Sequence, residues 1–391
     1  MQFLIDIFVY ASFACIMSFL AWMSCKKNGY ESQRLDLWLW MYILFFTFIS
    51  AIRWNVGVDS PMYFKGFLYG DVGLNAQEGS ERIWSWWVNL IHRSSLSPTI
   101  GMGGAALLQI FFLTDALKKY RRLLIVLPFI LFGSRYFLDY SNAVRQMIAA
   151  SIFVWSIQFI LSRNIIKYAL SIFLASLIHQ SALGLIVFFF VPAKLDLAKF
   201  RWPLLITLLF CFVIGMTPSF KGAGTVIQSI LSYLGYDIYT DRVTLILGTK
   251  YSDEALGFGP MMLSYLLISI FIIWYGPILR NRYESLIPAF DIWFLFANIY
   301  SCLYFLVCNV SHLFIRPLMY FELFQLIIAS LVLLNFINSR YKLSMMALFY
   351  YCIVPTNTVW DVWKAQGKKF ESATYKTILT YPYKTELHHF R

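Results

Sequence analysis

The chain has 391 residues, of which 60% are hydrophobic, 19% are aromatic and only 13% are charged. Soluble domains carry about 25% charged residues, and the apolar residues here form runs such as LLIVLPFILF and LLISIFIIWYGPIL that lack a polar face. This composition excludes a soluble fold and predicts an all-α polytopic membrane protein. The net charge of +12 comes from basic residues spread between the apolar runs, so nucleic acid is not an expected partner.

The apolar runs approach the length of about 20 residues that a helix needs to cross a membrane. The period-two alternation of a transmembrane β-barrel is absent. We predict about twelve transmembrane helices, in a single transmembrane domain over 1–355. Two segments, 165–178 and 181–193, are short, so they tilt, thin the bilayer or form a hairpin that dips into it. In chain order the predicted segments are 3–23, 36–52, 99–117, 123–138, 142–162, 165–178, 181–193, 202–217, 260–279, 288–308, 313–337 and 342–355.

Positive charge in short connections marks the cytoplasmic side of a membrane protein. The long outer loops at 53–98 and 218–259 and a C-terminal tail at 356–391 are therefore predicted to be extracytoplasmic, as are both termini. Since ATP and nucleotide sugars are absent there, and the chain has no Walker A sequence, an ATP-driven pump is not expected. The basic residues that set this topology lie in alternate short turns: Lys26, Lys27, Arg34, Lys118, Lys119, Arg121, Arg122, Arg163, Lys167, Lys194, Lys199, Arg201, Arg280, Arg282, Arg340 and Lys342.

Several ionisable residues lie at the outward ends of the predicted helices. A charged side chain at the bilayer centre costs at least about 2.5–3.5 kcal/mol, so ionisable residues within or beside membrane segments are candidates for function. They come from separate parts of the sequence yet share one predicted face of the membrane. They are Arg53, Asp59, Arg135, Asp139, Arg145, His179, His312 and Arg316.

These residues also have structural interpretations. An arginine at a helix end can extend its head to phospholipid headgroups, a lone histidine is commonly a hydrogen-bonded structural residue, and the outer Trp and Tyr residues fit an interfacial aromatic belt. The convergence of several arginines instead favours an anionic ligand, because guanidinium groups bind phosphate oxygens bidentately. A lipid pyrophosphate fits best, since its tail stays in the bilayer. The His179 imidazole can act as a general base near neutral pH.

Five motifs, in order along nearly the whole chain, resemble the EpsG family of bacterial exopolysaccharide polymerases, which are relatives of the Wzy-type O-antigen polymerases. One departure is Val58, where the family resemblance leads us to expect a threonine or serine before the aspartate. No hydroxyl chemistry is therefore possible at that position. The motifs are RWNVGVDSPMY (53–63), NAVRQMIAASIF (142–153), ASLIHQSALG (175–184), IRPLMYF (315–321) and YPYKT (381–385).

The resemblance implies a GT-C-like membrane glycosyltransferase architecture in the bacterial cytoplasmic (inner) membrane. It implies an enzyme that polymerises polyprenyl-pyrophosphate-linked oligosaccharide repeat units into exopolysaccharide, capsule or O-antigen. The expected partners are the lipid-linked oligosaccharide, membrane lipids, a chain-length regulator and other polysaccharide-assembly proteins. No cofactor is expected, and no DxD motif or clustered histidines and carboxylates indicate a metal.

The resemblance also implies roles for individual residues. In this hypothesis the catalytic residue that takes the acceptor proton is His179 or Asp59. The residues expected to bind pyrophosphate and glycan are Arg53, Arg145, Arg316, Tyr63 and Gln146.

Three other functions fit parts of the pattern. A flippase of lipid-linked oligosaccharide needs many helices and a cationic cavity, but it would be expected to show two similar halves, and no convincing internal repeat is present. A membrane O-acyltransferase would need an acyl donor supplied from the cytoplasm, and the predicted cytoplasmic turns are too short to bind one. An O-antigen ligase performs the same chemistry on a different acceptor, and only the family resemblance favours a polymerase over it.

Overall fold

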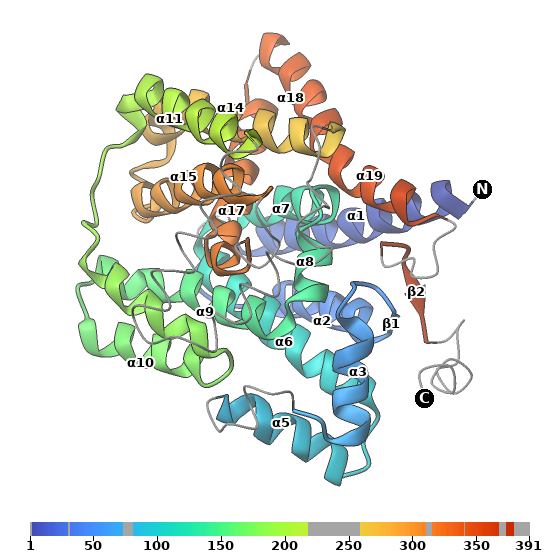
Figure 1. Cartoon of the computed structure of the whole chain (residues 1–391). Helices are drawn as coiled ribbons and strands as arrows, with labels where there is room; N and C mark the ends of the chain where they lie inside the picture. The colour runs from blue at the N-terminus through green and yellow to red at the C-terminus, as the bar shows by residue number, and fades with distance from the viewer. Residues whose placement is uncertain are drawn as a thin grey trace.

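The computed structural model describes residues 2–29, 32–72, 81–217, 259–309, 315–339, 341–366 and 373–378. Almost all of the predicted loop at 218–259, together with His312 and the motif at 381–385, lies outside these ranges. The described part is helical apart from a ladder of two short strands (Figure 1). Its elements are α1 (Gln2–Asn28), α2 (Leu37–Ala51), β1 (Arg53–Trp54), α3 (Ser60–Tyr69), α5 (Arg82–Arg93), α6 (Pro98–Leu117), η1 (Lys118–Tyr120), α7 (Arg121–Gly133), α8 (Tyr136–Asn142), α9 (Val144–Leu161), α10 (Ile165–Ser176), η2 (Gln180–Phe190), η3 (Ala198–Phe200), α11 (Arg201–Met216), α14 (Pro260–Tyr283), α15 (Phe290–Val307), η5 (Arg316–Leu318), α17 (Met319–Ile337), α18 (Tyr341–Ile353), α19 (Pro355–Ala365) and β2 (Lys376–Thr377).

Seven helical stretches among the described residues are long and apolar enough to cross a membrane. One of them, Pro98–Gly133, comprises α6, η1 and α7. The backbone leaves the helical region at Tyr120 (φ −122°, ψ 51°), so α6 and α7 are separate helices. The helices α2, α10 and η2 are apolar but shorter. The predicted all-α membrane class is therefore confirmed, while the figure of about twelve crossings stays a prediction.

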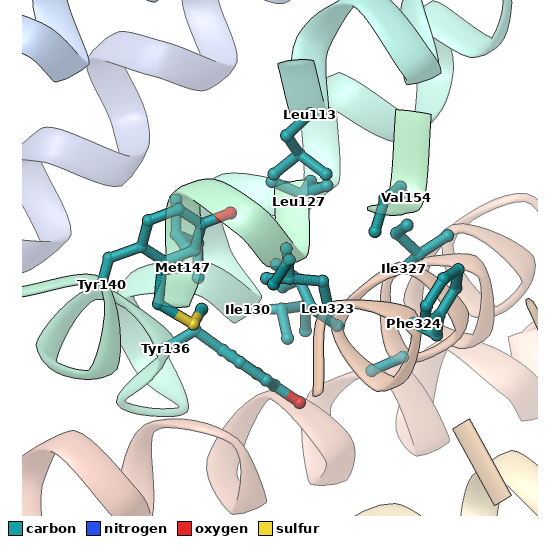
Figure 2. Packing of buried hydrophobic residues seen from close by; sticks show 14 of the residues in the cluster. Leu113, Leu127, Ile130, Tyr136, Tyr140, Met147, Val154, Leu323, Phe324 and Ile327 are labelled. Atoms are coloured by element: carbon teal, nitrogen blue, oxygen red, sulfur yellow. The ribbon is translucent and has the colours of Figure 1, made fainter. Parts of the chain in front are cut away.

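The helix α17 forms the centre of the bundle. Almost all of its residues are buried, and it packs against α7, α9, α14, α15 and α18. Figure 2 shows Leu323 and Ile327 of α17 close to Ile130 of α7 and Val154 of α9. The Phe324 ring lies 5.4 Å from the Phe153 ring, centroid to centroid. A predominantly apolar helix suits this central position, since it packs against five other helices, and its buried Gln325 side chain hydrogen-bonds Tyr136, Ser269 and Ser301.

The peripheral helices instead expose large apolar side chains on the outside of the bundle. Ile166 of α10, Phe210 of α11 and Leu348 of α18 are more than half exposed. Apolar surface of this extent is unusual on a soluble protein and matches the surface that acyl chains would cover. The short segments α10 and η2 pack together as a hairpin, in which the Tyr168 hydroxyl donates to the Leu185 carbonyl at 2.7 Å.

A buried arginine joins the turns at one end of the bundle. Arg121, at the start of α7, is fully buried and lies 2.5 Å from the Asp36 carboxylate that caps α2. The same guanidinium donates to the Ser24 carbonyl near the end of α1 and to the Arg34 carbonyl. A buried charge needs such partners, because leaving it unpaired costs about 3–5 kcal/mol. The first and second predicted basic turns therefore lie together.

The later basic turns reach the same end. The Tyr120 ring lies 5.7 Å from Trp293, near the start of α15, and Arg280 pairs with Asp291 at 2.8 Å. Arg282 donates to the Asn335 side chain at the end of α17. We call this part of the molecule the basic end.

The first helix and the last described segment (373–378) meet at the opposite end of the bundle. The Tyr10 hydroxyl of α1 donates to the Ala373 carbonyl at 2.7 Å, and β2 pairs antiparallel with β1, opposite Arg53 and Trp54. The helix α19 packs against α1, α7 and α14. The helix α1 has 27 residues and therefore spans roughly 40 Å at a rise of about 1.5 Å per residue. It runs from this end, where Tyr10 lies, to the basic end, where Ser24 lies (Figure 1).

A glycine in α11 tests the helix packing. A Cβ atom added at Gly215 would lie 1.9 Å from the Phe305 carbonyl oxygen of α15, whereas one added at Gly184 meets nothing within 4 Å. Gly215→Ala is therefore expected to destabilise the protein by about 1–3 kcal/mol through overpacking. Gly184→Ala is the matched control and is expected to be close to neutral. Thermal unfolding of the purified variants in detergent measures the difference, and equal transition temperatures would contradict this packing.

Candidate functional site

A sharp turn brings the Asp59 loop against the start of α9. Gly57 has φ +92°, a conformation that favours glycine, and a Cβ atom there would lie 2.8 Å from the Asn142 side-chain oxygen. The turn lets the Asp59 N–H approach that same oxygen at 3.4 Å. Asp59 then precedes α3, with no side-chain hydrogen bond to the helix N-terminus. Its carboxylate is consequently free to face other elements.

Glu81, immediately before α5, is the centre of the polar contacts at this end. The side chain is fully buried, and its Oε2 pairs with the Arg145 guanidinium. Its Oε1 lies 2.8 Å from His179 Nδ1 and accepts a second hydrogen bond from the Gln180 N–H at 3.3 Å. One carboxylate thus links three segments that are far apart in sequence: the start of α5, the start of α9 and the break between α10 and η2.

Arg145 has further contacts on its other sides. Its guanidinium lies 5.9 Å from the Trp84 ring centroid and interacts electrostatically with the Tyr63 hydroxyl. The Tyr63 ring in turn meets Trp84 edge-on at 5.8 Å. Within the described residues, the Arg145 Nε–H has no hydrogen-bond acceptor. An arginine carries five donors, and Arg145 thus keeps one buried donor without a partner in the described part of the chain.

Arg316 lies on the exposed side of this cluster. The side chain is 59% exposed, and its Nη2 lies 3.4 Å from the Asp59 carboxylate. The Gln146 side-chain amide donates to the Arg316 carbonyl and so fixes the backbone of the η5 turn against α9. Nearby, the Ser181 and Tyr320 hydroxyls lie 2.8 Å apart. Among the described residues, the arginine head is thus held by one long ion pair at the surface.

The two carboxylates differ electrostatically. Burial raises the pKa of the Glu81 carboxyl, but the hydrogen bond from His179 and the charge of Arg145 outweigh burial and hold the pKa below its ordinary value. Glu81 is therefore ionised at neutral pH. Burial also raises the pKa of Asp59, and there the charges of Arg316 and Arg145 do not outweigh it, so that pKa lies above its ordinary value.

Arg53 is placed differently from the other predicted arginines. Its side chain is buried, and it donates to the backbone carbonyls of Ser50 at 3.1 Å and Ser141 at 3.5 Å. Its backbone lies in the β1–β2 ladder opposite Thr377. These contacts fit a residue that joins α2, α8 and the C-terminal strand. A ligand-binding role for Arg53 stays a prediction.

Arg135 and Asp139 belong to a separate cluster. Arg135 pairs with Asp139 at 3.6 Å and with Asp361 of α19 at 3.5 Å. The two carboxylates compensate the arginine charge, so this cluster serves to attach α19 to the α7–α8 junction. No group of three or more His, Cys, Asp or Glu side chains in the described ranges is arranged to hold a metal ion.

The structure therefore gathers most of the residues predicted from sequence, although their roles stay predictions. Arg145 and His179 meet through Glu81, and Asp59 meets Arg316. Sequence reasoning missed Glu81, which is the only acidic residue of the amphipathic segment 81–93. The position of this acidic residue immediately before a helix is only a weak indication of function in the sequence. The residues brought together are Asp59, Tyr63, Arg145, Gln146, His179 and Arg316.

The family comparison agrees with the motifs found in the sequence. The family model described as EpsG family matches residues 36–384, which is nearly the whole chain and includes every residue of the cluster. No curated protein and no solved structure matches the chain. The chain belongs to the EpsG family, whose members are Wzy-type polymerases.

Proposed function

We propose that this protein polymerises polyprenyl-pyrophosphate-linked oligosaccharide repeat units on the extracytoplasmic face of the bacterial inner membrane. The observation that carries the proposal is the convergence of Arg145, Arg316 and His179, from three separate segments, at the end of the bundle opposite the basic turns. Basic turns face the cytoplasm in membrane proteins, so the cluster would face outward. The membership of the EpsG family supports the same activity.

The two arginines suit the pyrophosphate of the donor. The Arg145 side chain is 17% exposed, and the Arg316 side chain is 59% exposed with one long ion pair. Both can therefore donate to phosphate oxygens, which guanidinium groups bind in fork-like geometry. As the leaving group departs, its negative charge grows, and preformed positive charge stabilises the transition state most strongly there.

The reaction needs no nucleotide. A hydroxyl oxygen of the acceptor repeat unit attacks the anomeric carbon of the donor glycan, and the bond from that carbon to the pyrophosphate oxygen breaks. The electron pair leaves with polyprenyl pyrophosphate, and His179 or Asp59 takes the hydroxyl proton. The aromatic side chains around Arg145 (Tyr63 and Trp84) offer ring faces beside which sugar rings can stack.

The size profile of surface glycan from a strain lacking this gene tests the proposal. A polymerase predicts that single repeat units still reach the outside while the long-chain ladder disappears. Repeat units trapped on the cytoplasmic face would instead indicate a flippase. A full ladder that stays attached to the lipid carrier would indicate a ligase, and an intact ladder lacking only acyl groups would indicate a modifying enzyme.

Replacing Arg145 is expected to abolish the long polymer. Arg145→Ala removes the guanidinium, and loss of a charge-assisted hydrogen bond worth about 1.5–3 kcal/mol predicts at least about a tenfold fall in polymer. The variant should still be inserted in the membrane, which a membrane-fraction blot checks. The control is Arg93→Ala, because Arg93 is an exposed arginine at the end of α5. Normal chain length in the Arg145→Ala strain would contradict the assignment.

A further inference from the structure

The contact between Glu81 and His179 fixes which imidazole nitrogen carries the proton. Nδ1 of His179 lies 2.8 Å from Glu81 Oε1, and Glu81 is ionised, so its carboxylate can only accept hydrogen bonds. Nδ1 must therefore hold a proton. In the neutral imidazole the lone pair is then on Nε2, which makes no hydrogen bond to any described residue. The side chain is 21% exposed, so part of the imidazole is accessible from outside the described structure.

The carboxylate is held in place independently of His179. Its Oε2 pairs with Arg145, and its Oε1 also accepts from the Gln180 N–H. The backbone beside it is fixed as well, because the Ile83 N–H at the start of α5 donates to the Leu177 carbonyl at the end of α10 at 3.0 Å. Since Glu81 is fully buried, water does not compete for these contacts. The orientation of the imidazole follows from a rigid junction.

We propose that Glu81 is a positioning residue that holds His179 in the Nδ1-protonated tautomer, so that Nε2 is the base for the acceptor hydroxyl. The inference rests on the proposed polymerase function and goes beyond it by separating His179 from Asp59. In the step, the hydroxyl proton moves to Nε2 while the oxygen attacks the anomeric carbon, and the electron pair of the broken bond leaves with pyrophosphate. The imidazolium formed is stabilised by the Glu81 carboxylate and later releases its proton to water.

Asp59 is less suited to this role. Its carboxylate already pairs with Arg316, which we assign to the pyrophosphate, and protonating it would weaken that pair as the leaving group departs. His179, in contrast, has a ring nitrogen without a hydrogen-bond partner among the described residues and a carboxylate at the other ring nitrogen. The same carboxylate contacts Arg145, so Glu81 also sets the separation between the base and the leaving-group site. The ionisable groups around this junction, from every element that packs there, are Glu81 before α5, Arg145 of α9, Tyr63 and Asp59 at α3, Tyr320 of α17 and Arg316 of η5.

The test uses the purified full-length chain in lipid vesicles, with polyprenyl-pyrophosphate-linked repeat units extracted from the deletion strain as substrate. A general base contributes about 10²–10⁴-fold, so His179→Ala is expected to lower kcat by at least about 10²-fold. Glu81→Gln keeps the shape of the side chain but loses its charge, and it is expected to lower kcat at least about tenfold. The matched control is Glu284→Gln at the basic end, where the side chain is exposed and pairs with Arg280.

Two readouts separate positioning of His179 from a general loss of structure. Glu81→Gln should lower kcat with little change in KM for the donor, because Glu81 acts through the base. In a His179→Ala background, Glu81→Gln should cause no further fall in kcat, whereas an effect through Arg145 would persist in that background. A raised KM with unchanged kcat, or losses that multiply, would each overturn the inference.

The failure of the inference differs from the failure of the proposed function. Full polymerisation by His179→Ala would overturn the role of the Glu81–His179 pair and leave the polymerase assignment intact. A wild-type protein that lengthens no glycan would overturn the function itself. If Glu81→Gln reduces the amount of folded protein, the pH profile of His179→Ala decides, because loss of the acidic limb supports the inference and retention of that limb overturns it.

Discussion

A charge buried among apolar helices must be paired or hydrogen-bonded, and this constraint organises the described structure. Leaving one unpaired costs about 3–5 kcal/mol, more than most single packing contacts. Arg121 meets Asp36, Arg135 meets Asp139 and Asp361, and Arg145 meets Glu81. Apart from Arg135 and Asp139, which are one helical turn apart, these pairs join segments that are distant in sequence. The first closes the basic end, the second attaches α19, and the third builds the junction of α5, α9 and α10. The central helix α17 supplies the apolar surface against which these helices pack.

The two ends of the bundle differ in how their arginine side chains are paired and exposed. At the basic end, Arg121 is fully buried and pairs with Asp36, and Arg280 pairs with Asp291. At the other end, Arg316 is 59% exposed and lies 3.4 Å from the Asp59 carboxylate. We propose this second end as the binding site of the lipid-linked anion, with its tail beside exposed apolar helices. In this proposal one face holds the pyrophosphate and presents a base beside it, without a nucleotide.

Much of this could be predicted from sequence, for physical reasons that differ by element. Long apolar runs specify α1, α14, α15 and α17 directly, because few other structures can bury them. The number of crossings could not be fixed, since the short runs at α10 and η2 do not reveal whether they span. Glu81 was missed because its role comes only from tertiary contacts with Arg145 and His179, which no periodicity encodes. In the same way, the two backbone carbonyls that hold Arg53 are invisible in its motif.

The central claim is that the donor's own pyrophosphate bond drives chain extension at the outward cluster. The most direct measurement follows the purified protein in lipid vesicles with labelled polyprenyl-pyrophosphate-linked repeat units and no nucleotide or nucleotide sugar. The account predicts a ladder of lengthened glycans and the release of one polyprenyl pyrophosphate for each new linkage. A glycan that lengthens only when a nucleotide sugar is added, or that lengthens without releasing polyprenyl pyrophosphate, would contradict the account.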